Sequence, residues 1–165
     1  GARFVDLAEI GSYEDGFFNL EVFGKADRVV YLAAYLYHYR RDGSSSVTSG
    51  YNPRLYDQWQ TLYDRMEAII RSNQLGSEYE AALNNRIALG ILGLGLNITV
   101  STQSMGKKVK DIHRIIRQER YRKAYKNLPL NYFPIHWKLF YGCARHGFAF
   151  GVYVLLTVIQ RIISR

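Results

Sequence analysis

Two adjacent carboxylates, Glu14 and Asp15, stand in the stretch "GSYEDGFFNL", directly before a glycine and two phenylalanines. A carboxylate in a fixed position can act as a general base and take a proton from a hydroxyl group. Two acids are also typical of the first turn of a helix, where they stabilise the helix dipole. The stretch by itself leaves both interpretations open, a catalytic pair and a charged helix start.

The first 50 residues predict one helix, one strand and one loop. Ser12 precedes Asp15 by three residues, which is a capping-box-like pattern, so we expect a helix over about 14–24. In the second half of the stretch 28–40, tyrosines alternate with other residues, which is the period of a strand. The polar run 41–52 predicts a loop.

The rest of the chain predicts helices. Asn52-Pro53 is typical of a helix start, and apolar residues recur every three to four positions over 53–73. Ser77 and Glu80 form a second capping box before a helix over about 77–103. The glycines and apolar residues in its second half predict the buried central helix of a bundle. That apolar run is too short to cross a bilayer.

Two further helices are expected, a basic one over about 107–125 and an apolar one over about 135–164. Arg145 would lie near the middle of any bilayer-spanning placement of the last helix, so spanning is disfavoured. The hydrophobicity of the last helix fits both a membrane surface and a protein core or dimer. The neighbouring basic helix favours an anionic membrane, because each Lys or Arg near such a surface contributes about 1 kcal/mol.

Composition and charge narrow the class of protein. The chain has 165 residues, enough for one domain with a core, and 48% of them are hydrophobic. Its single cysteine, Cys143, excludes a disulfide framework within the chain. The net charge is +8, and the basic residues gather in the second half. This indicates an anionic partner, either acidic lipid or nucleic acid, with a solvated basic face as the alternative.

Several common functional motifs are absent from the sequence. It contains no GxGxxG, no GxxxxGK[ST], no HExxH and no GxSxG, and its four histidines are scattered. We therefore expect neither a metal site nor a catalytic triad built wholly within this chain. The basic helix matches no recognisable nucleic-acid module, so a nucleic-acid partner is not expected.

One ordered set of features resembles the acceptor-side end of the catalytic domain of family 2 glycosyltransferases, the type that builds bacterial surface polysaccharides. The resemblance covers about residues 1–50. Its members are Phe4, the pair Glu14-Asp15, Phe18, Ala26, the expected strand pair, Tyr37–Arg40 and a serine loop that ends in "SSSVT".

The resemblance implies an inverting transfer of a sugar from a nucleotide sugar to a glycan acceptor. Asp15 is then the expected base, and Glu14 positions Asp15 or the acceptor. Arg40 is expected to contact the phosphates of the leaving nucleotide, and Ser46 to add a hydroxyl donor. His38 lies opposite Tyr37 and Tyr39 in an alternating strand, so we expect it to pack rather than to approach a metal.

The resemblance also implies a fold, a cofactor and a missing part. The fold class is α+β and predominantly helical, with a short β-hairpin or strand remnant of a GT-A domain before a C-terminal helical bundle. Members of the family hold Mn²⁺ or Mg²⁺ with an Asp-x-Asp motif, which this chain lacks. We therefore expect a C-terminal piece that is inactive in isolation, with the metal ligands mostly outside it.

The expected domains are residues 1–50, the edge of the catalytic domain, and 51–165, a helical extension for membrane contact or self-association. The expected location is cytoplasmic, peripheral on the inner face of the plasma membrane. The alternative function is a non-enzymatic helical module that binds an anionic membrane or a partner protein.

Overall fold

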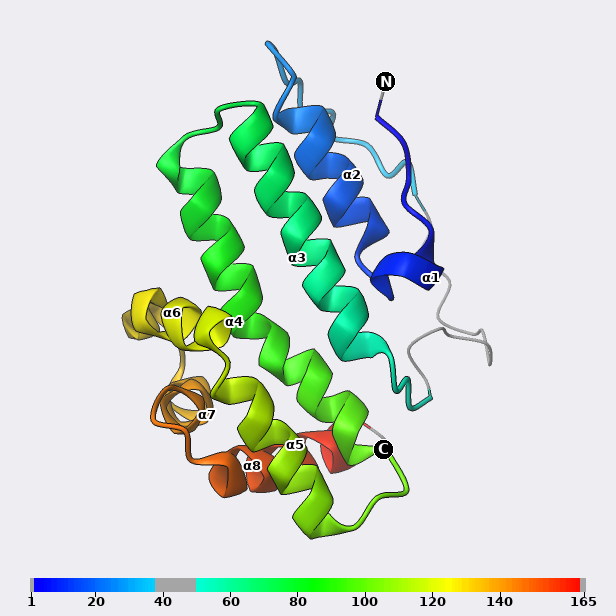
Figure 1. The fold of residues 1–165 in the computed structure, drawn as a ribbon. Coiled ribbons are helices and arrows are strands. Elements are labelled where there is room, and N and C mark those ends of the chain that lie inside the picture. Colours follow the sequence, from blue (N-terminus) through cyan, green and yellow to red (C-terminus); the bar gives the residue numbers. More distant parts are fainter. Residues whose placement is uncertain (1, 38–49, 164–165) are drawn as a thin grey trace.

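The chain folds into helices in its computed structural model, which describes residues 2–37 and 50–163. Those residues contain no strand. The elements are α1 (Leu7–Ile10), α2 (Glu14–Phe23), α3 (Leu55–Ser72), α4 (Ser77–Thr99), α5 (Met105–Ile116), α6 (Glu119–Asn127), the 3-10 helix η1 (Leu130–Tyr132), α7 (Ile135–Arg145) and α8 (Ala149–Ile163). Figure 1 shows α2, α3 and α4 side by side, with α5 and α8 beside the C-terminal half of α4.

Helix α4 is the centre of the bundle. Helices α3, α5, α6 and α8 all pack against it, and Ile87, Ile91, Leu94 and Ile98 of α4 are buried. By length and composition α4 could cross a bilayer, but here its apolar side chains form the core of the described chain. The predicted buried central helix is confirmed.

Glycines in α4 let the neighbouring helices approach closely. A Cβ at Gly90 would collide with the Tyr63 hydroxyl group of α3, and one at Gly93 would lie 2.6 Å from Cη2 of Trp59. A Cβ at Gly95 would collide with Leu156 of α8. The glycines therefore make room for α3 and for α8, as the sequence predicted.

The single basic helix predicted over 107–125 is wrong, because the chain turns at Arg117 and Gln118 and forms α5 and α6 instead. The buried residues of α5 are Ile112, Ile115 and Ile116, and those of α6 are Tyr121, Ala124 and Tyr125. At about 100° per residue, these two sets would lie on opposite faces of one straight helix. A turn between them lets both sets reach the core.

The single helix predicted over 135–164 is also wrong, because Gly147 ends α7 before α8 begins. Gly147 has φ +76°, the left-handed conformation that glycine adopts readily at the C-terminal end of a helix. The N–H of Phe148 donates to the carbonyl oxygen of Cys143 at 2.8 Å, the long hydrogen bond of a Schellman motif. A glycine after Arg145 and His146 is a stop signal that the sequence analysis overlooked.

The strand predicted over 28–40 is wrong for the residues that the structure describes. Residues 28–37 form no helix and pair with no other segment, and most of their apolar side chains are exposed. Tyr35, for example, is 99% exposed. A strand needs a neighbour to take its backbone hydrogen bonds, and the described residues offer none. The strand remnant of the expected α+β fold is therefore absent from the part of the chain that the structure describes, whereas the predominantly helical character is confirmed.

Two of the predicted helix caps are wrong, although the helices they were meant to start are present. Tyr13, in the left-handed conformation, precedes α2, and the Ser12 hydroxyl group accepts a hydrogen bond from Trp59 instead of capping the helix. Gly76 precedes α4, and Ser77 is already its first helical residue. Packing on α3 decides how α2 begins.

Four tyrosines from α3, α6 and α7 are buried together beside α4. They are Tyr63, Tyr121, Tyr125 and Tyr141. Burial disfavours the tyrosinate anion, so it raises the pKa of Tyr63 and of Tyr141 to about 12 and raises the pKa of the other two further. All four hydroxyl groups therefore keep their protons in the folded chain at neutral pH.

We expect Gly90→Ala to destabilise the fold although alanine is the better helix former. The added methyl group would press on Tyr63, which is fully buried, and on the Trp59 ring at 3.3 Å. Overpacking of this kind costs about 1–3 kcal/mol. Urea denaturation followed by circular dichroism measures the loss.

The matched control is Gly142→Ala in α7, where a Cβ meets no atom within 4 Å. There the better helix propensity of alanine should raise the free energy of unfolding by about 0.5–1 kcal/mol. Equal effects of the two substitutions would contradict the close packing of α3 on α4.

We expect the folded chain to lose stability between pH 10 and pH 12. A buried tyrosine with a pKa of about 12 keeps its proton where an unfolded one, with a pKa of 10.0, releases it. The free energy of unfolding therefore falls as the pH rises through this window, by on the order of 2–3 kcal/mol for Tyr63. Tyr63→Phe should make the free energy of unfolding less dependent on pH in this window, and Tyr35→Phe should not. A free energy of unfolding that stays constant between pH 10 and pH 12 would contradict the expectation.

Candidate functional site

The predicted acidic pair lies in the first turn of α2. Asp15 is exposed, and its Oδ1 accepts a hydrogen bond from the N–H of Gly16 at 2.6 Å. Glu14 is half-buried. The partial positive charge at the N-terminus of a helix attracts both carboxylates. The other oxygen of Asp15 forms no hydrogen bond with the described residues, so it is available to a hydroxyl group.

Tyr13 fixes the backbone just before the acidic pair. Its ring lies across Gly16, where any Cβ would collide with it, so the glycine of "EDG" is a packing requirement. The Arg86 guanidinium of α4 stacks on the Tyr13 ring, 3.9 Å from its centre. It also lies 5.1 Å from the centre of the Trp59 ring. Cation–π contacts of partly buried groups contribute about 1–2 kcal/mol. Arg86 thereby ties the start of α2 to the central helix.

Arg86 was missed by the sequence analysis, although one signal marked it. It is the only charged residue between Glu80 and Lys107, in the middle of an apolar helix. A lone charge in such a place needs a partner that compensates its burial. The partner here is aromatic, and aromatic partners cannot be identified from spacing.

Two further contacts hold the N-terminal segment. The Trp59 indole N–H donates to the Ser12 hydroxyl oxygen at 3.1 Å. The rings of Phe4 and Phe18 stack with their centres 4.4 Å apart, which brings together two of the residues that carry the family resemblance. Both contacts fix the segment on which Glu14 and Asp15 lie.

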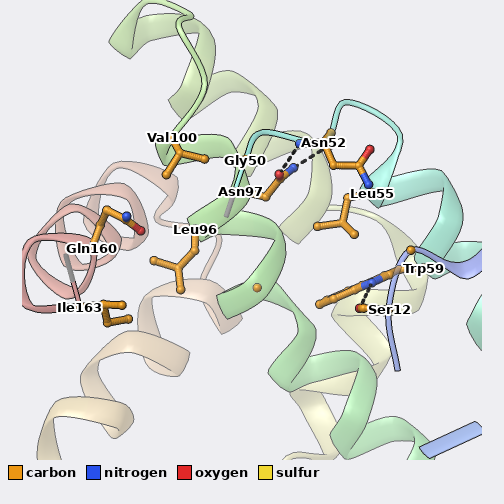
Figure 2. A pocket seen from close by; sticks show the side chains of 12 residues that line it. Ser12, Gly50, Asn52, Leu55, Trp59, Leu96, Asn97, Val100, Gln160 and Ile163 are labelled. Carbon is orange, nitrogen blue, oxygen red and sulfur yellow. Dashed lines mark hydrogen bonds between the residues drawn. The ribbon is translucent and has the colours of Figure 1, made fainter. Parts of the chain in front are cut away.

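A cavity of about 370 Å³ opens beside Ser12, between α3, α4 and the end of α8. Figure 2 shows its lining, in which apolar side chains surround three amides. Its lining residues are Gly11, Ser12, Gly50, Asn52, Leu55, Trp59, Gly93, Leu96, Asn97, Val100, Gln160 and Ile163. A cavity of this size and character fits a small apolar group with one or two polar atoms.

Asn97 of α4 holds the rim of this cavity. Its Oδ1 accepts from the backbone N–H of Asn52 at 2.7 Å, and its amide group donates to the backbone carbonyl oxygen of Asn52 at 2.8 Å. The Asn52 side chain in turn donates to Gln58, which donates to the carbonyl oxygen of Ala8. This network joins α1, α3 and α4. The predicted helix start at Asn52-Pro53 is wrong, because α3 begins at Leu55 and Arg54 occupies the cap position.

The remaining predicted site residues cannot be placed. Arg40, Ser46 and His38 lie outside the described residues, so their roles stay predictions. Glu14 and Asp15 are placed, and among the described residues no cation lies within salt-bridge distance of either.

The described residues do not fit a divalent metal ion by themselves. They contain no group of three or more His, Cys, Asp or Glu side chains that could hold one, and Glu14 and Asp15 are only two neighbouring carboxylates. Hard cations such as Mg²⁺ take about six oxygen ligands. No chemical step of this site is therefore assigned to a metal held by these residues.

Comparison with known proteins gives no relative for this chain. No protein-family model, no curated protein and no solved structure matches it.

We expect Asn97→Ala to lower the free energy of unfolding by about 1–3 kcal/mol, because it leaves the backbone N–H and carbonyl group of Asn52 without their partner. The matched control is Asn84→Ala on the same helix, whose amide donates only to the carbonyl oxygen of Glu80 one turn earlier. That substitution should be nearly neutral. Similar urea midpoints for the two variants would show that the network contributes nothing.

Proposed function

We propose that this chain is the C-terminal portion of a family 2 glycosyltransferase, which transfers a sugar from a nucleotide sugar to a surface polysaccharide or glycolipid acceptor with inversion. The proposal rests on the resemblance in residues 1–50. The structural observation that supports it best is the exposed apolar segment 28–37, which follows the acidic helix α2.

This segment, residues 28–37, has the composition of a strand but no strand beside it in the described chain. Its large apolar side chains are exposed at 64% or more: Val29, Val30, Tyr31, Leu32, Tyr35, Leu36 and Tyr37. An apolar stretch of this size is rarely left in water by a complete protein. A catalytic domain with further strands would cover it, and such a domain is what the resemblance implies.

The proposed chemistry uses the position of Asp15. The acceptor hydroxyl group attacks the anomeric carbon from the face opposite the nucleotide, and its proton passes to the Asp15 carboxylate. The new carbon–oxygen bond forms as the bond to the nucleotide phosphate breaks, and the diphosphate leaves with the electron pair. A single displacement of this kind inverts the configuration, by the same geometric logic as inverting glycoside hydrolysis.

The other assigned residues support this step. Glu14, half-buried beside Asp15, positions the base or the acceptor. Arg40 and Ser46 bind the phosphates of the leaving nucleotide, where a guanidinium group offers a bidentate contact. A divalent metal ion, Mn²⁺ or Mg²⁺, belongs to the nucleotide-binding half of the proposed enzyme. The cytoplasmic face of the plasma membrane is the proposed location.

A second candidate is a non-enzymatic helical module that binds a membrane or a partner protein. It is favoured by the bundle of α3 to α8, which buries its own core without any other domain. The coding sequence upstream of residue 1 separates the two candidates. A strand-rich half with an Asp-x-Asp motif supports the transferase, and any other upstream sequence supports the module.

We expect Asp15→Asn to lower kcat by about 10²–10⁴-fold in the polypeptide that joins this chain to a nucleotide-binding half, because the amide cannot take a proton. The affinity for the nucleotide sugar and the helical ellipticity should not change. The matched control is Asp27→Asn, an exposed aspartate just after α2, which should retain full activity. Incorporation of the labelled sugar from the donor into the acceptor gives the rate. Undiminished transfer by Asp15→Asn would remove Asp15 from the mechanism.

A further inference from the structure

Helix α8 is apolar on both of its faces. Ala149, Val152 and Leu156 are buried against the bundle. The opposite face carries Phe150, Val154, Val158 and Ile162, which follow one another at intervals of four residues and are all exposed. The outer face of a helix in a soluble bundle is normally polar. No other part of the described chain covers this one.

The same apolar face continues onto α7 at the corner between the two helices. The Phe148 ring lies against Gly151, which leaves no room for a Cβ, and Cys143 Sγ of α7 lies 3.1 Å from the same position. Phe148 is exposed, with its ring centre 6.5 Å from that of Phe150, and Leu139 is exposed one turn before Cys143. The α7–α8 apolar surface is therefore continuous, and it consists of Leu139, Phe148, Phe150, Val154, Val158 and Ile162.

The surroundings of this surface are cationic. The chain has no acidic residue after Glu119. The Arg117 guanidinium fills the space that a Cβ at Gly147 would need, so it lies beside the corner that carries Phe148. Arg161 is exposed on the outer side of α8, one turn after Val158, and Lys138 precedes Leu139 on α7. None of these three cations has a carboxylate partner among the described residues.

We propose that the α7–α8 apolar surface binds the surface of an anionic lipid bilayer, with α8 lying in the plane of the interface. Its apolar side chains enter the boundary between headgroups and acyl chains, as those of amphipathic interfacial helices do. Arg117, Arg161 and Lys138 contact the lipid phosphates from the rim. The 15 described residues of α8 reach about 22 Å, which is shorter than a hydrocarbon core of about 30 Å.

Charge decides between a bilayer and a second copy of this chain. A symmetric dimer through this surface would bring the same patch of each copy together, cations against cations. The region offers no carboxylate to compensate, and like charges across an interface cost several kcal/mol. An anionic bilayer supplies the complementary charge over the whole rim.

The inference does not depend on the proposed transferase function, because vesicle binding needs neither a donor nor an acceptor. The test is flotation of the chain with vesicles of phosphatidylglycerol mixed with phosphatidylcholine, and with vesicles of phosphatidylcholine alone. We expect binding to the mixed vesicles that weakens as salt is added, and little binding to the neutral ones.

The variants test whether vesicle binding depends on the α7–α8 apolar surface or on any exposed apolar side chain. Phe150→Ser should weaken binding to the mixed vesicles roughly tenfold, because a half-exposed phenylalanine no longer enters the bilayer. Phe23→Ser, at a phenylalanine of α2 that is 51% exposed against 50% for Phe150, should leave binding unchanged. Arg161→Gln should weaken binding about fivefold, whereas Arg71→Gln on α3 should not. Circular dichroism confirms that each variant is folded.

Three results would overturn the proposal. The first is equal binding to neutral vesicles at high salt. The second is an equal effect of Phe150→Ser and Phe23→Ser on vesicle binding. The third is a chain that binds no vesicles but changes from dimer to monomer on Phe150→Ser, measured by sedimentation velocity, which would assign the surface to self-association.

Discussion

Close packing on the glycine face of α4 is the constraint on which the rest of the structure depends. Gly90 and Gly93 bring α3 close enough for Tyr63 and Trp59 to lie directly on the α4 backbone, and Gly95 does the same for Leu156 of α8. Glycine costs helix stability, by about 1 kcal/mol relative to alanine. Dispersion contacts over three closely packed helices offset that cost. Without this approach, neither α3 nor α8 would reach its present position.

The N-terminal segment is held by individual polar and aromatic contacts on this helical frame. Trp59, which α4 positions, donates to Ser12, while Arg86 stacks on Tyr13. Gln58 of α3 donates to the carbonyl oxygen of Ala8. The acidic pair at the start of α2 is thus located by residues that lie far from it in sequence. Its backbone conformation, with Tyr13 left-handed, is a consequence of tertiary packing and not of a local cap.

The sequence predicted what depends on periodicity and missed what depends on tertiary contacts. The helix over 53–73 is confirmed, since its apolar residues follow the helical repeat. The helix over 14–24 is present too, although the cap that predicted it is not. The breaks at Gln118 and Gly147 were missed because charge and hydrophobicity continue through them. The first break could have been predicted from the sequence, because Ile116 and Tyr121 would lie on opposite faces of one continuous helix. The strand prediction for 28–37 is wrong for another reason. Alternating residue types show that a segment could join a sheet, but not that a partner strand is present.

The candidate site was also predicted only in part from the sequence. The acidic pair was visible because its residue types carry chemistry, whereas Arg86 and Asn97 act through geometry that no local pattern encodes. Gln160 and Ile163 in the last turn of α8 line the same cavity as Ser12, and the outer side of α8 carries the exposed apolar stripe. One helix therefore links the surface proposed for lipid to the cavity beside the acidic segment. In the proposed transferase, a rigid link of this kind would fix the distance between Asp15 and the proposed lipid surface.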